Sequence, residues 1–228
     1  MAQSNYIYAY REACHVLAER LDPEEIARLA SCRFDTAGSY FELPFLGRLY
    51  RVSYPDGEVT PGDPLPSAPG APPAPSSQAL LTASILIVHY LTKARGTPLA
   101  GEWIAFRELP GGNVYVNPFT NRTIRPMVAW FGKEPKRITA AAQRLGGRRE
   151  SFGHASASID VFKMVPVCFV VWEGDDEVPS SGQILFDRSA SDYLDTEDLV
   201  VAAGEALYAA RSAAGPEGAP RPQTLEPA

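Results

Sequence analysis

The sequence predicts a single α+β domain in which a mixed or antiparallel sheet packs against a central apolar helix. Residues 78–94 (QALLTASILIVHYLTKA) are apolar on most helical faces, which indicates a helix in the middle of the core. Residues 167–172 are an uninterrupted apolar run, typical of a strand buried on both faces. The other predicted helices and strands do not alternate regularly, and this favours an α+β arrangement.

The N-terminal part, residues 1–59, predicts two helices and a hairpin that belong to the same domain. Apolar residues at helical spacing indicate a first helix over 6–21. The segment Asp22-Pro23-Glu24-Glu25 predicts the start of a second helix, because Asp can cap, Pro suits the first turn and acidic side chains favour the positive helix end. Two β-rich segments around Gly47 predict strands over 40–46 and 48–54.

A Pro-rich segment separates this part from the core. Residues 60–77 are dense in Pro, Ala, Gly and Ser, so we expect an exposed loop or linker without a regular element. The segment is either an insertion loop or the boundary of a small N-terminal subdomain. The main α+β core is predicted over 78–212, and the Pro- and Gly-rich residues 213–228 predict a disordered tail.

The remaining core elements follow from turn residues and apolar spacing. Strands are predicted over 102–109, 114–116 and 155–163, and the last of them pairs with the buried strand. Helices are predicted from Asn117 onward, over 134–145 and over 199–210. Pro126 has to bend or divide the first of these helices, because proline cannot donate a backbone hydrogen bond.

Charge and composition restrict the classes of partner. The chain has 228 residues, and its 45% hydrophobic content is ordinary for a folded protein with a substantial core. A net charge of −6 argues against nonspecific nucleic-acid binding and against adsorption to an anionic membrane. The apolar stretch 79–91 is too short to span a bilayer. A small molecule or a protein remains as the partner, and the oligomeric state stays open.

The cysteines predict a reducing environment. Cys14, Cys32 and Cys168 form no CxxC pair, and the N-terminal residues lack the apolar region of a secretion signal. We therefore expect a cytoplasmic protein. A structural zinc site is disfavoured because the ligand spacing and a fourth ligand are missing. Cys168 is expected to act as a small buried hydrophobic residue.

An acidic cluster follows the buried strand and is the candidate for catalysis. Asp175, Asp176 and Glu177 stand together in the segment WEGDDEVP. His154 could reach them, although a loop histidine is the simpler interpretation. Grouped carboxylates raise one another's pKa, which suits a general base, and their oxygens suit a divalent cation. The simpler interpretation is a solvated turn.

Aromatic and charged residues offer a candidate ligand pocket. Trp103, Arg107, Phe119 and Trp172, together with Asp187, could surround a planar or anionic ligand. Aromatic residues within strands and helices are more often core residues, and Asp187 is also placed to cap a helix.

One histidine lies within the central helix. His89 sits in the apolar segment with no neighbouring ligand in the sequence, so we expect a hydrogen-bonded core histidine.

Several motifs in order resemble a known family. They are residues 86–91 (LIVHYL), 97–109 (TPLAGEWIAFREL), 144–147 (RLGG), 172–179 (WEGDDEVP), 184–187 (ILFD) and 194–198 (LDTED). Together they resemble an uncharacterised bacterial and archaeal domain of unknown function, over about residues 6–210. Some members of that family are associated with iron–sulfur and corrinoid-methyltransfer proteins, which implies an accessory role around a cofactor. The chain lacks a cluster-type cysteine array, so we expect no iron–sulfur centre within it.

Three functions follow from these observations. The first is a ligand- or cofactor-binding accessory domain, with its pocket between the 78–94 helix and the 102–109 strand and the acidic turn at the rim. The second is an enzyme that uses the acidic cluster as a general base or metal site. The third is a subunit that binds a protein partner through an exposed apolar face. The sequence names no substrate and no cofactor.

Overall fold

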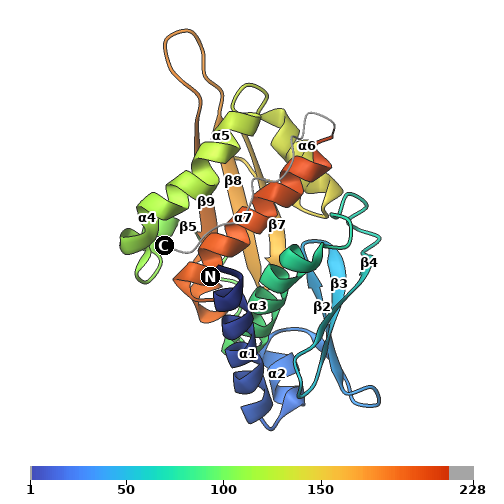
Figure 1. The fold of residues 1–228 in the computed structure, drawn as a ribbon. Helices are drawn as coiled ribbons and strands as arrows, with labels where there is room; N and C mark the ends of the chain where they lie inside the picture. The colour runs from blue at the N-terminus through green and yellow to red at the C-terminus, as the bar shows by residue number, and fades with distance from the viewer. Residues whose placement is uncertain (1, 216–228) are drawn as a thin grey trace.

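Helix α3 (Ser77–Lys93) is the element that holds the core together in the computed structural model, which describes residues 2–215 (Figure 1). The ring of Tyr90 stacks on Phe162 at 4.1 Å and on Tyr193 at 5.7 Å between ring centroids. Its hydroxyl donates a hydrogen bond to the Ala30 carbonyl at 2.7 Å. The prediction of a central apolar helix is confirmed, and this helix joins the N-terminal part to the rest of one α+β body.

The N-terminal strands form a four-stranded antiparallel sheet in the order β1-β2-β3-β4. Its strands are β1 (Arg33–Asp35), β2 (Tyr40–Phe45), β3 (Arg48–Ser53) and β4 (Val59–Pro64). The hairpin around Gly47 is confirmed. Leu46 and Gly47 have positive φ values of 48° and 76°. These values are typical of the two-residue hairpin turn whose twist matches that of the flanking strands.

The prediction that residues 60–77 hold no regular element is wrong for the first residues of that segment. They belong to β4, which pairs with β3 so that Pro61 lies opposite Tyr50. The sheet tolerates prolines there because β4 is an edge strand, whose outer side needs no backbone donors. Residues 65–76 contain neither helix nor strand.

The second sheet is also antiparallel and has the strand order β5-β9-β8-β7-β6. Its strands are β5 (Trp103–Ala105), β6 (Arg148–Arg149), β7 (Ala155–Phe162), β8 (Val165–Trp172) and β9 (Ser181–Asp187). The apolar run 167–172 lies in β8, the middle strand, and is buried there up to Val171, as predicted. The two sheets meet where the Leu46 N–H donates to the Val161 carbonyl at 3.1 Å.

Helices pack on the five-stranded sheet, and two further helices belong to the N-terminal part. Figure 1 shows α7 (Thr196–Ala213) lying across this sheet, with α6 (Lys136–Arg144) beside it, while α1 (Ala2–Glu19) packs on α3. The start of α2 (Pro23–Leu29) is as predicted, because Asp22 accepts a hydrogen bond from the Glu25 N–H. Residues 216–228 of the predicted tail lie outside the described residues.

Two predictions between α3 and α6 are wrong. Residues 114–116 are not a strand, since they lie in helix α4 (Gly112–Phe119), which continues through a π-helical turn into α5 (Arg125–Phe131). The β-branched residues there favour a strand locally, but packing overrides this weak preference. The strand predicted over 102–109 is only partly present, because Phe106–Glu108 form a short 3-10 helix.

Candidate functional site

A pocket of about 330 Å³ opens where the Pro-rich segment, the four-stranded sheet, α3 and α7 meet. This volume lies within the range of small-molecule sites. Its walls come from the β2–β3 hairpin, from residues 72–76, from the first turns of α3 and from the last turns of α7. The lining side chains of the hairpin and helices are Phe45, Leu46, Arg48, Tyr50, Ala79, Ala83, Glu205, Tyr208, Ala209, Arg211 and Ser212.

Small residues and prolines explain why space remains at this point. Ala79 and Ala83 of α3 and Ala209 of α7 all line the pocket, and side chains of this size leave space between the helices. The Pro-rich segment does not form a helix that would fill this gap, because each proline fixes its own φ angle. The segment is also tied to the body, since the Gly70 N–H donates to the Arg144 carbonyl at 2.7 Å.

Arg48 is the buried charged group of the pocket, with 8% of its surface exposed. Its guanidinium donates hydrogen bonds to the carbonyls of Gly62, at 2.5 Å, and Pro72, at 2.8 Å. These bonds fix the side chain between the edge strand and the Pro-rich segment. A guanidinium has more N–H donors than these two bonds use.

Two further ionisable groups come from α7. The guanidinium of Arg211 lies 4.0 Å above the centroid of the Trp130 ring, a cation–π contact that holds it in place. Glu205 is half-buried in the same wall. The pKa of Tyr50 is raised above its ordinary value of 10.0, mainly by burial, while Arg48 opposes the rise and Glu205 adds to it. The pocket is therefore apolar in its walls and carries charge of both signs.

The predicted acidic cluster is an exposed turn between β8 and β9, which projects from the body in Figure 1. Asp175 accepts hydrogen bonds from the N–H groups of Glu177 and Val178 at 2.9 and 2.8 Å, and these bonds lower its pKa. His154 lies at the base of this turn, where its Nδ1 accepts a hydrogen bond from the Glu173 N–H at 2.9 Å. A catalytic or metal-binding role of the cluster stays a prediction.

The predicted aromatic residues are spread over the five-stranded sheet. Trp103 pairs with Asp187 and Trp172 pairs with Ser181, at opposite ends of β9. The length of this strand separates them by roughly 20 Å. Phe119 is 1% exposed and stacks on Phe106 at 4.0 Å between centroids, so it is a core residue.

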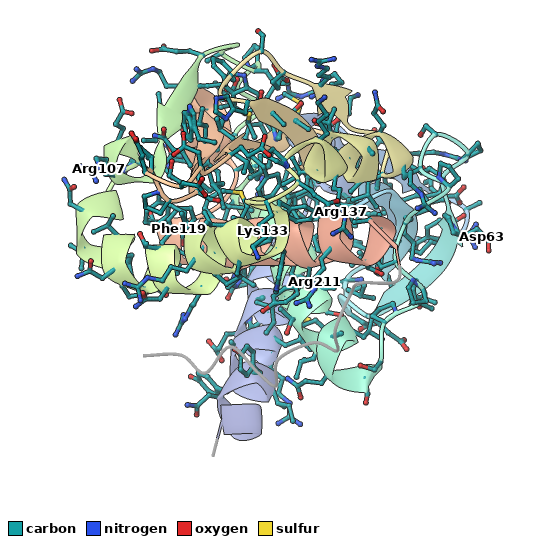
Figure 2. All side chains as sticks on the ribbon, turned by 90° about the horizontal axis from the view of Figure 1, so that it is seen from above. Asp63, Arg107, Phe119, Lys133, Arg137 and Arg211 are labelled. Carbon is teal, nitrogen blue, oxygen red and sulfur yellow. The ribbon has the colours of Figure 1, made fainter. Side chains whose placement is uncertain are left out.

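Arg107 is exposed and, in Figure 2, projects from the outer edge of the molecule, well separated from Arg211. None of the predicted ligand-binding residues lines the pocket described above.

Asp187 is buried by the backbone that it organises. Its carboxylate accepts hydrogen bonds from the N–H groups of Ala100 and Gly101, at 2.9 and 2.8 Å, and from the N–H and hydroxyl of Ser189. Burial by itself raises the pKa of Asp187, but these hydrogen bonds outweigh burial and lower it. Asp187 caps the short helix Arg188–Asp192, as one interpretation of the sequence expected.

A second charged cluster joins α3 to the start of α7. Nδ1 of His89 lies 2.9 Å from Oδ1 of Asp198, and Lys93 donates to the other oxygen of Asp198 at 2.8 Å. Lys93 also reaches Asp195 at 2.5 Å. Burial alone raises the pKa of Asp198, but His89 and Lys93 outweigh it and lower the value. His89 is hydrogen-bonded, as predicted, through a partner that is far away in the sequence.

The cysteines do not converge on one another. Burial raises the pKa of Cys32 and of Cys168 to about 12, so both thiols stay protonated near neutral pH. Cys14 lies beside the Gly57 carbonyl, at 3.8 Å from its sulfur. Within residues 2–215, no three His, Cys, Asp or Glu side chains are arranged to hold a metal ion. In this same part of the chain, no helix has the length and apolar character needed to cross a membrane.

The pocket residues were missed because their meeting depends on tertiary contacts. One signal was available for Arg48, which alternates with Tyr50 and Val52 on the inward face of β3. A charged residue on the apolar face of a strand is unusual and marks a position that requires an explanation. No comparable signal singles out Glu205 and Arg211, which lie near the end of an amphipathic helix.

Comparison with known proteins identifies the family of this chain. No curated protein and no solved structure matches this chain. Residues 22–209 match the sequence pattern of a domain of unknown function, DUF3786. This match covers both sheets and most of the helices that pack on them, including the His89–Asp198 cluster and every lining residue of the pocket except Arg211 and Ser212. The chain therefore belongs to the DUF3786 family of domains of unknown function.

Proposed function

We propose that this protein is a small-ligand-binding domain whose site is the pocket between the Pro-rich segment and α7. The observation that carries the proposal is a space of about 330 Å³ with aromatic and alanine walls and a few fixed polar groups. Small-molecule sites have this composition, in which apolar walls supply affinity and a few polar groups supply orientation.

The proposed site differs in place from the one expected from the sequence. Both use the helix over 78–94 as a wall, but the pocket lies at the N-terminal end of that helix and faces β3 and α7. The Pro-rich segment thereby becomes part of the site, because residues 72–76 form one side of the pocket.

The size of the pocket limits which cofactors fit. About 330 Å³ is near the lower end of small-molecule sites and too small to enclose a corrin macrocycle. An accessory role beside corrinoid-methyltransfer or iron–sulfur proteins is therefore proposed only through a small substrate or a partner contact. The three cysteines do not fit an iron–sulfur cluster, because the raised pKa values of Cys32 and Cys168 keep their thiols protonated near neutral pH and the three do not converge.

A fluorescent apolar probe tests the proposal. N-phenylnaphthylamine, which is neutral and fluoresces in apolar sites, is titrated into the protein and into the variant Ala79→Phe, whose larger side chain fills the pocket. The matched control is Ala140→Phe, at an exposed position of α6. We expect saturable binding that is lost in Ala79→Phe and kept in Ala140→Phe. Equal binding by all three proteins contradicts the proposed site, as does the absence of saturable binding both for this probe and for its anionic analogue, anilinonaphthalene sulfonate.

The acidic turn supports a second candidate function, in which Asp175, Asp176 or Glu177 acts as a general base or binds a divalent cation. Its support is the position of His154 at the base of the same turn, bonded to the Glu173 N–H. A melting-temperature screen with Mg²⁺, Ca²⁺ and Mn²⁺ tests it, since a ligand that binds only the folded state raises stability. A shift that disappears in Asp176→Ala supports the second candidate, and no shift with any of these ions argues against cation binding there.

A further inference from the structure

We infer that the pocket takes a small molecule with one anionic group and an apolar body, and that Arg48 and the N-terminus of α3 receive the anionic group. This inference rests on the proposed ligand-binding function and adds the chemical class of the ligand. Carboxylate and sulfonate groups, which each carry a single negative charge, share the required chemistry.

The charge of Arg48 is uncompensated. Its partners are two carbonyl oxygens, which accept hydrogen bonds but carry no net charge. No carboxylate within residues 2–215 forms an ion pair with it. Buried charged side chains are normally paired, because the charge is costly to remove from water without a partner. A ligand anion provides the missing partner without displacing either carbonyl, since N–H donors of the guanidinium remain.

The N-terminal end of α3 lies at the pocket. This helix has 17 residues, and Ser76 and Ala79 of its first turn line the pocket. The side chain of the capping residue Ser76 makes no capping hydrogen bond. The backbone N–H groups at the start of a helix have no partner within the helix, and the helix dipole adds partial positive charge there. An anion beside Arg48 and this helix end would interact with both.

The pocket as a whole carries a net positive charge. The two guanidinium groups of Arg48 and Arg211 stand against the single carboxylate of Glu205, which leaves one net positive charge among the lining residues. This balance favours a ligand with a single negative charge over a dianion. Glu205 lies on the α7 wall, so it also disfavours an anionic group on that side and directs the group toward Arg48.

The apolar body of the ligand would pack against the remaining walls. The rings of Phe45 and Tyr50 lie edge to face at 5.8 Å between centroids and form a rigid aromatic surface. Ala79, Ala83 and Ala209 add small apolar side chains to the lining. Planar rings and small side chains together suit a flat or branched apolar group.

Two probes that differ only in charge test this inference. Anilinonaphthalene sulfonate carries one sulfonate, and N-phenylnaphthylamine has the same ring skeleton without it. We expect the sulfonate probe to bind at least about 10-fold more tightly, as a charge-assisted hydrogen bond to a buried group implies. Arg48→Met should weaken the sulfonate probe by about 10-fold or more and change the neutral probe by less than about 2-fold. Arg48→Lys should restore part of the lost affinity.

Controls separate a folding defect from a lost contact. Arg33→Met removes an exposed arginine of the same sheet and should change neither affinity. Arg211→Met removes the second cation of the pocket, which lies over the Trp130 ring, and should also weaken only the sulfonate probe. Circular dichroism melts show which variants are folded.

The outcomes distinguish the two proposals. If both probes bind equally and Arg48→Met and Arg211→Met weaken neither selectively, the anionic class is wrong while the pocket remains a ligand site. If neither probe binds saturably, or if Ala79→Phe leaves both affinities unchanged, the proposed function itself is wrong.

Discussion

Replacement of Asp198 by Asn should destabilise the protein through the cluster that joins α3 to α7. The substitution keeps the shape of the side chain and removes its charge. Asp198 has a side chain only 12% exposed and contacts both His89 and Lys93. An asparagine has one oxygen left for these two partners, so one of them then faces an NH₂ group that cannot accept its proton.

The size of the effect follows from these contacts. A hydrogen bond to a charged group contributes about 1.5–3 kcal/mol. Lys93 is 31% exposed and keeps its second partner, so we expect a loss of about 2 kcal/mol rather than the full cost of breaking a buried ion pair. For a chain of this length, that corresponds to a melting temperature lower by roughly 4–8 °C.

Asp195→Asn is the matched control. Asp195 contacts the same Lys93 at 2.5 Å from the same helix, but its side chain is 73% exposed, so water screens the pair. We expect a loss of at most about 0.5 kcal/mol. Urea unfolding followed by circular dichroism measures both variants. If both variants lose the same free energy of unfolding, or if Asp198→Asn loses none, burial of the Asp198 carboxylate does not decide its contribution to stability.

The pH dependence gives a second readout of the same cluster. Because the pKa of Asp198 is lowered in the folded protein, its carboxylate contributes fully to folding stability above its ordinary pKa of 3.8. This contribution is lost as the pH falls further and the folded protein takes up the proton. As the pH falls below about 3.8, the difference in the free energy of unfolding between the wild type and Asp198→Asn should therefore become smaller. Above that pH the difference should not narrow.

Two further predictions concern the core. Gly147→Ala should destabilise by about 1–3 kcal/mol in a urea titration, since an added Cβ would lie 2.3 Å from the Ser158 carbonyl oxygen. Phe119→Ala should cost about 3–5 kcal/mol because Phe119 is buried against Phe106; a loss below about 1 kcal/mol would instead favour its sequence-based assignment to a ligand site.

Local signals predicted much of the fold. The Asp22-Pro23 start of α2, the hairpin at Gly47, the helix over 78–94 and the buried β8 all follow from capping residues, turn residues and apolar patterns. The failures occur where tertiary context decides. Strand β4 exists because it can pair at the edge of a sheet, which neighbouring residues alone do not show.

The candidate site was less predictable than the fold. The acidic turn was recognisable from composition, but whether its carboxylates meet other groups depends on the path of the chain. Arg48 comes near Glu205 and Arg211 only through the packing of a hairpin on the last turns of α7. In the same way, His89 meets Asp198 across 109 residues of sequence. Local periodicity carries no information about such contacts.

The most direct test of the central claim is to map the binding of N-phenylnaphthylamine on the backbone amides by two-dimensional nitrogen–proton NMR. The claim predicts that the largest shifts occur at Ala79, Ala83 and Ala209, which line the pocket from two helices. Shifts concentrated in the turn between β8 and β9, or spread evenly over the surface, would contradict the claim that this pocket is the binding site.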